Sequence, residues 1–153
     1  MHNIAHCWGS IQDYILSTVF YKPTSVDPVT GKLVVDATDI EGQVRFEKNE
    51  FPYQLTEGGN HSVLWLGPTP SGALPTEDDI NVYITSALRD CTRAKECVTE
   101  DGSDQYTKHD DQFDFVWYEN PKMTVPLVYH LQVFWCHLPA SNDGAKNNQN
   151  EGV

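Results

Sequence analysis

Residues 113–136 read FDFVWYENPKMTVPLVYHLQVFWC and decide the fold. Aromatic and β-branched residues dominate this stretch, and such side chains fit the pleated, half-buried surface of a sheet. We expect two strands joined by a short loop around Asn120-Pro121, forming the paired centre of a sheet. In the second strand His130 and Gln132 are two residues apart, so alternation directs both side chains to the same face.

The composition limits both the architecture and the classes of partner. The chain has 153 residues, 39% of them hydrophobic, which suits one globular domain over 1–137 followed by a polar, flexible tail over 138–153. The formal net charge of −12 opposes binding to nucleic acid or to an anionic membrane surface. No apolar run is long enough to span a bilayer, and the N-terminal residues lack the pattern of a signal peptide. We therefore expect a soluble, cytoplasmic protein.

The four cysteines are too few and too scattered for a disulfide framework in a chain of this length, so we expect reduced thiols. The spacing between Cys91 and Cys97 is too wide for a compact Cys-x-x-Cys zinc motif, although a local disulfide between them stays open. The segment His109-Asp110-Asp111 is typical of a solvated loop. We expect no metal and no cofactor. The cysteines are Cys7, Cys91, Cys97 and Cys136.

Two segments have the apolar periodicity of amphipathic helices. The first is predicted over residues 6–20. The second begins after Thr76, which can cap the helix with Asp79 three positions later, and runs to about Asp90. The periodic residues are Trp8, Ile11, Ile15 and Val19 in the first segment and Ile80, Ile84, Ala87 and Leu88 in the second.

Short strands are predicted before and between these features. Gln43–Glu47 alternates polar and apolar residues, and His61–Leu66 is an apolar run bounded by glycines and prolines. A shorter strand, Leu33–Val35, is expected to interrupt a turn-rich loop, and residues 98–112 are polar and acidic. The sequence thus predicts an α+β fold: a single domain with a mainly antiparallel sheet packed by two main helices.

Four blocks of the sequence read NEFPY at 49–53, GNHSVLW at 59–65, VWYENP at 116–121 and YHLQVFW at 129–135. In this order they resemble the fungal N-acetylglucosamine-induced protein 1-like family, a group defined by a domain of unknown function. The resemblance covers roughly residues 43–136. It implies no secure activity.

More distantly, the chain is similar to the histidine-triad and galactose-1-phosphate uridylyltransferase superfamily, whose members have an Asn-x-Phe-Pro-like turn, a helix and a hairpin that ends in alternating histidines. The resemblance implies a histidine-triad-like fold. In those enzymes the second histidine attacks the α-phosphorus and forms a covalent nucleotidyl intermediate. Here His130 matches the first histidine, Gln132 the second and Phe134 the third.

Gln132 is the departure from the enzymatic pattern, because an amide lacks the basic lone pair of an imidazole and cannot attack phosphorus. A glutamine can still donate and accept hydrogen bonds, so a ligand-binding pocket remains the hypothesis. For the tryptophans, core packing is the alternative. The candidate ligand-binding residues are Asn49, Tyr53, His61, Trp65, Trp117, Asn120, His130 and Gln132.

Two classes of function follow. The favoured one is a non-catalytic binding or assembly protein that holds a small polar ligand, such as a nucleotide or sugar phosphate, or contacts a basic protein partner. The alternative is a divergent phosphohydrolase, or a nucleotidyl or sugar-phosphate transferase. In that case His130 or His61 would be the general acid–base, because imidazole titrates near neutral pH.

Overall fold

The computed structural model describes residues 4–50, 53–96, 112–119, 125 and 128–138. Within these residues no helix is both long enough and apolar enough to cross a membrane. The described helices are α1 (Ile4–Cys7), α2 (Ile11–Thr18) and α3 (Glu77–Glu96), and the strands are β1 (Thr24–Val26), β2 (Leu33–Val35), β3 (Val44–Lys48), β4 (Asn60–Leu66), β5 (Phe113–Glu119) and β6 (Tyr129–His137).

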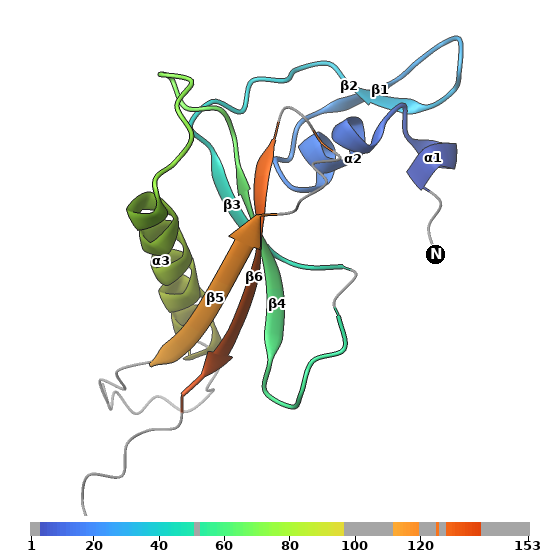
Figure 1. The fold of residues 1–153 in the computed structure, drawn as a ribbon. Coiled ribbons are helices and arrows are strands. Elements are labelled where there is room, and N and C mark those ends of the chain that lie inside the picture. The colour runs from blue at the N-terminus through green and yellow to red at the C-terminus, as the bar shows by residue number, and fades with distance from the viewer. Residues whose placement is uncertain (1–3, 51–52, 97–111, 120–124, 126–127, 139–153) are drawn as a thin grey trace, which may run out of the picture.

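Four strands form an antiparallel sheet in the order β3-β4-β6-β5, and β1 pairs with β2 in a separate two-stranded sheet. The α+β class and the mainly antiparallel sheet are therefore confirmed. Figure 1 shows α3 along one side of the large sheet, while α1, α2 and the β1–β2 pair lie together toward one end. The strand that carries His130 and Gln132, β6, is central because it bonds to β4 on one side and to β5 on the other.

Helix α3 covers the apolar face of the sheet. Its start is the predicted one, because Thr76 Oγ1 accepts the Asp79 N–H and Asp79 Oδ2 accepts the Thr76 N–H, at 3.2 and 2.9 Å. Burial of apolar area between helix and sheet holds the two layers together. The buried residues are Ile80, Ile84 and Leu88 from the helix and Leu64, Leu66, Leu131 and Val133 from β4 and β6.

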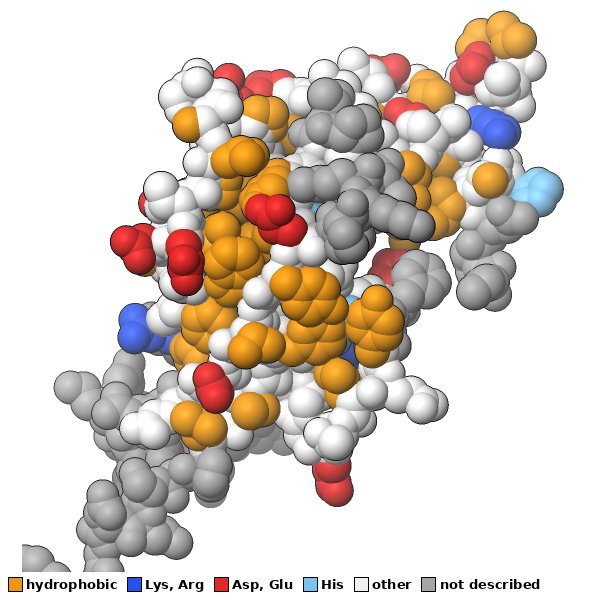
Figure 2. All heavy atoms as spheres, in the orientation of Figure 1, with side chains coloured by type: hydrophobic (Ala, Val, Ile, Leu, Met, Phe, Trp, Pro, Cys, Tyr) orange, Lys and Arg blue, Asp and Glu red, His pale blue; other side chains and the backbone are white. Residues whose placement is uncertain are grey.

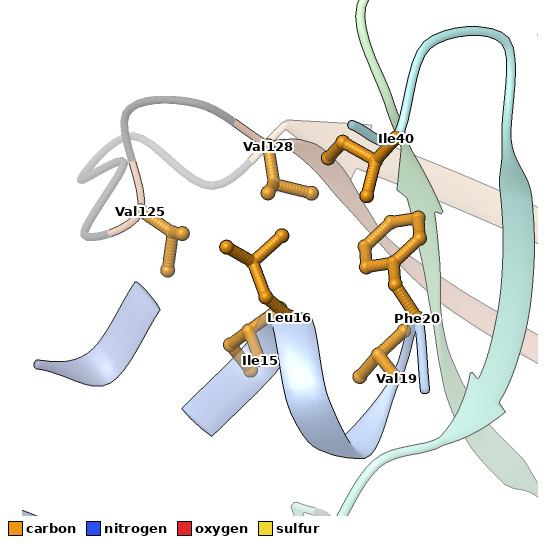
Figure 3. Close-up of a cluster of buried hydrophobic side chains, with 7 residues drawn as sticks. All are labelled: Ile15, Leu16, Val19, Phe20, Ile40, Val125 and Val128. Atoms are coloured by element: carbon orange, nitrogen blue, oxygen red, sulfur yellow. The ribbon is translucent and has the colours of Figure 1, made fainter. Parts of the chain in front are cut away.

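Helix α2 buries its apolar side in a second cluster, which Figure 3 shows as Leu16 directed toward Val125 and Val128. Trp65 packs against this cluster. Trp65 alternates with the inward Leu64 and Leu66 along β4, so it lies on the sheet face opposite α3. The α2 cluster therefore covers one end of that opposite face.

The prediction of one continuous helix over residues 6–20 is wrong, because the helix is interrupted between α1 and α2. Gly9 donates its N–H to Leu33 O at 2.8 Å, which takes this backbone donor out of any helix. Ser10 then caps α2 by accepting the Asp13 N–H at 3.1 Å. A contact with a distant strand causes the break, and helical spacing contains no sign of it.

Three other features of the fold differ from the prediction. Helix α3 ends at Glu96 instead of about Asp90, because residues 91–96 contain no Pro or Gly and are rich in good helix formers. Strand β1 was not predicted, because it lies in a segment whose composition is typical of turns. The connection between β5 and β6 spans residues 120–128, which is longer than the short loop expected.

Some predicted segments lie wholly or largely outside the described residues. They include most of the polar segment 98–112 and all of the tail 138–153 except Leu138. Cys97 is also outside. The other cysteines, Cys7, Cys91 and Cys136, are free thiols.

Candidate functional site

The face of the sheet opposite α3 carries a hydrogen-bonded polar cluster, which we call the amide–imidazole cluster: Asn49, His61 and Gln132. His61 Nε2 lies 2.6 Å from Gln132 Oε1, and Asn49 Nδ2 lies 3.4 Å from the same oxygen. Asn49 follows β3 and its N–H bonds to His61 O at 3.0 Å, which extends the ladder by one residue. Three strand segments far apart in the sequence thus bring these side chains together.

The neighbours of His61 assign its tautomer. The Tyr53 backbone N–H points at Nδ1 from 3.4 Å, so Nδ1 is the acceptor. Nε2 therefore carries the proton and donates it to Gln132 Oε1. Asn49 Nδ2, at 3.1 Å from Nε2, is then a close contact and not a hydrogen bond to that atom. His61 is 3% exposed, so both of its ring nitrogens are fixed by the protein in a buried setting.

Aromatic rings extend the cluster across the sheet. His61 stacks on Phe134 with centroids 4.2 Å apart, and Tyr53 stacks against both rings, with its centroid 5.4 Å from His61 and 6.2 Å from Phe134. Tyr118 stacks on Phe134 at 5.6 Å. Tyr53 and Tyr118 are 65% and 44% exposed, so the two ends of the row are open to a ligand. Figure 2 shows hydrophobic side chains gathered over the region of β5, the strand that carries Tyr118.

His130 lies on the same face but in a different environment. It is 3% exposed, stacks on Trp65 with centroids 4.9 Å apart, and its Nδ1 lies 3.2 Å from Val128 O. A carbonyl can only accept, so Nδ1 carries the proton and Nε2 keeps its lone pair. Among the described residues that lone pair has no hydrogen-bond partner. In the ladder His130 pairs with Trp65 and His61 pairs with Phe134, so the two histidines do not face each other.

The structure separates one of the predicted residues, Trp117, from this group. Trp117 is on the α3 side of β5, where its Nε1–H donates to Asn81 Oδ1 at 3.0 Å. Core packing, the alternative considered for the tryptophans, therefore describes Trp117. Asn120 lies outside the described residues.

Helix α2 fixes the backbone beside the cluster. The Tyr14 hydroxyl donates to Glu50 Oε2 at 2.6 Å, directly after Asn49. This hydrogen bond to a carboxylate, together with partial burial, raises the pKa of Tyr14 to about 12. The phenol stays protonated at neutral pH and remains a donor, so α2 is tied to the segment that positions Asn49.

A half-open pocket of about 340 Å³ lies elsewhere, between the 67–75 loop, Tyr83 of α3 and Tyr129. None of the predicted site residues lines it. The candidate site is therefore a polar and aromatic surface on the opposite side of the sheet, which we distinguish from this apolar pocket. Within the described part of the chain, no three His, Cys, Asp or Glu side chains are grouped closely enough to hold a metal ion.

Sequence reasoning missed two residues that belong to this face. Tyr118 alternates with Trp117 and so points away from α3, which the period of the strand could have indicated. Arg45 alternates in the same way with the inward Val44 and Phe46, and it pairs with Trp65 in the ladder. In both cases the alternation along the strand predicts two faces, but the sequence does not show which of them α3 covers.

No protein-family model, curated protein or solved structure matches this chain.

Proposed function

We propose that the chain is a non-catalytic binding protein with a histidine-triad-like fold, which holds a small polar ligand at the amide–imidazole cluster. One observation carries the proposal: Oε1 of Gln132, the residue that the resemblance aligns with the nucleophilic histidine, accepts the proton of His61 at 2.6 Å. The order β3, β4, α3, β5, β6 supports the fold assignment and membership of the N-acetylglucosamine-induced protein 1-like family. The free thiols Cys7, Cys91 and Cys136 support a reducing compartment, the cytoplasm.

The hydrogen bond to His61 determines what Gln132 can offer a ligand. Because Oε1 is used as an acceptor, the side chain presents its NH₂ group, which carries two donors. Among the described residues these donors have no partner. His61 has both ring nitrogens occupied and acts as a support for Gln132. The cluster therefore favours a ligand with acceptor oxygens, such as the hydroxyl, carbonyl or phosphate oxygens of a sugar phosphate or nucleotide, lying beside the exposed Tyr53 ring.

The test is a titration of ¹⁵N-labelled protein with nucleotides and sugar phosphates, in which the Gln132 side-chain NH₂ resonances are followed directly. We expect these resonances to shift and Gln132→Ala to weaken binding by between about twofold and tenfold, the range for one neutral hydrogen bond. Gln112→Ala is the matched control, because it removes the same side chain just before β5. Equal affinity for both variants and the native protein would contradict the proposal.

A second candidate, a divergent phosphohydrolase or nucleotidyl or sugar-phosphate transferase, is favoured by His130, whose Nε2 lone pair has no partner among the described residues. Turnover of a phosphate ester that disappears with His130→Ala but persists with Gln132→Ala would replace the binding proposal by this one. His130→Gln keeps a buried hydrogen-bonding side chain and controls for loss of folding.

A further inference from the structure

Arg45 stands out on the sheet face opposite α3 because of its Nε atom. This atom is buried and has no hydrogen-bond partner among the residues that the structure describes. Among the described residues no carboxylate forms an ion pair with this guanidinium, although the chain has 22 Asp and Glu residues against 10 Lys and Arg. Buried charged donors are normally paired, so an orphan Nε in an acidic protein requires an explanation.

The Arg45 guanidinium lies over an aromatic ring. Its guanidinium carbon lies 5.5 Å from the centroid of the Tyr21 ring, which is 69% exposed. Tyr21 has a φ of 54°, in the left-handed region that non-glycine residues rarely adopt, and Lys22 N–H bonds back to Leu16 O at 3.0 Å. The chain reversal after α2 thus places a ring over the guanidinium. A cation–π contact orients the group but satisfies none of its five N–H donors.

The chemistry that would complete this arrangement is an oxyanion. A guanidinium presents planar pairs of N–H donors that match a carboxylate or phosphate, and Nε–H is one member of the side-on pair. In the ladder Arg45 pairs with Trp65, which in turn pairs with His130. Two strand spacings of about 4.8 Å separate the backbones of Arg45 and His130. A bound anion would thus lie on the same side of the sheet as His130.

We propose that Arg45 is the anchor of an oxyanion-binding site, which takes a carboxylate or phosphate group between the Tyr21 ring and the Trp65 side of the sheet. This goes beyond the proposed function, because the described contact of Arg45 is with Tyr21 and not with Asn49, His61 or Gln132. A ligand that carries both hydroxyl groups and an anionic group would engage the two places together.

The experiment follows the Arg45 side-chain Nε–H resonance in the native protein, assigned by its loss in Arg45→Lys. Inorganic phosphate, acetate and a simple sugar phosphate are titrated separately at constant ionic strength, with chloride as the baseline for screening. We expect the Arg45 resonance to shift saturably with at least one of these anions. A stronger response to phosphate than to acetate identifies a phosphate site, and the reverse identifies a carboxylate site.

The variants separate this site from general charge effects. Arg45→Gln should weaken anion binding by on the order of tenfold to a hundredfold, the range for a charge-assisted hydrogen bond. Arg45→Lys should bind with intermediate affinity, because it keeps the charge and loses the planar fork. Arg89→Gln, the same charge change at an exposed position of α3, should bind like the native protein.

Two outcomes overturn the inference: an Arg45 resonance that stays unmoved by all three anions, or an Arg45→Gln variant that binds the anion as tightly as Arg89→Gln. The first outcome does not depend on the folding of a variant, because the resonance is followed in the native protein. The Gln132 NH₂ resonances report on the amide–imidazole cluster separately, so failure at Arg45 and failure of the proposed function are distinguishable.

Discussion

The hydrogen bond between His61 and Gln132 should be measurable as a coupling free energy. The appropriate variants are His61→Phe, which keeps an aromatic ring in contact with Tyr53 and Phe134, and Gln132→Met, which keeps an unbranched side chain of similar length. Each variant removes one partner of the 2.6 Å contact. The double variant removes both.

The structure sets the expected size of each effect. Gln132→Met leaves the Nε2–H of a residue that is 3% exposed without its acceptor, which costs about 1–3 kcal/mol of the free energy of unfolding. Gln132 is only partly buried, so in His61→Phe water can solvate its Oε1. This variant should lose about 0.5–1.5 kcal/mol of the free energy of unfolding. In the double variant no buried N–H group of this pair is left without an acceptor. We therefore expect a coupling free energy of about 1–2 kcal/mol.

The assay is equilibrium urea unfolding of the four proteins, followed by tryptophan fluorescence and fitted with a common slope. The control pairs Gln132→Met with Asn81→Ala, which alters the Trp117 hydrogen bond on the opposite side of the sheet and should be additive within about 0.5 kcal/mol. If the His61 and Gln132 substitutions are equally additive, the assigned tautomer and the basis of the candidate site are wrong.

Three further substitutions test other parts of the fold. Leu88→Ala empties a fully buried position under α3 and should lower the free energy of unfolding by about 2–5 kcal/mol in a urea titration. Hydrogen bonds from Thr76 lower the pKa of Asp79 below its ordinary value of 3.8. The resulting stabilisation is complete above pH 3.8 and disappears as the pH falls through the lowered value. Asp79→Asn should therefore flatten the acid limb of the curve of stability against pH. Burial and the hydrogen bond to Glu119 raise the pKa of Tyr129 to about 12 from 10.0, so this stabilisation is present below pH 10 and is lost as the pH rises toward 12; Tyr129→Phe should remove one late step from the alkaline absorbance titration.

Each of these substitutions has a control in the chain. Val82→Ala on the exposed side of α3 should change stability by no more than about 0.5 kcal/mol. Asp78→Asn removes the neighbouring acid and keeps the capping hydrogen bonds between Thr76 and Asp79, so it should affect the acid limb less than Asp79→Asn. Tyr14, whose pKa is also raised to about 12, should still titrate late in Tyr129→Phe. An unchanged late absorbance step in that variant would show that Tyr129 is not held by Glu119.

The sequence alone determined those elements whose signals are local. Alternation over 43–47 and the glycines and prolines that flank 61–66 predicted two strands within one residue of their observed bounds, and Thr76 with Asp79 marked the start of α3. It also placed His130 and Gln132 on one face. Such features depend on residues a few positions apart, so the pattern itself contains the physical cause.

Only the tertiary structure decided which faces meet. The break before Ser10 depends on a hydrogen bond to Leu33, and the partner of His61 depends on which strand lies beside β4. The same register directs Trp117 toward α3, and the fold brings Arg45 beside Tyr21. These outcomes are set by pairing between segments many residues apart. A periodic pattern says that a strand has two faces, but the packing of the whole chain determines what each face contacts.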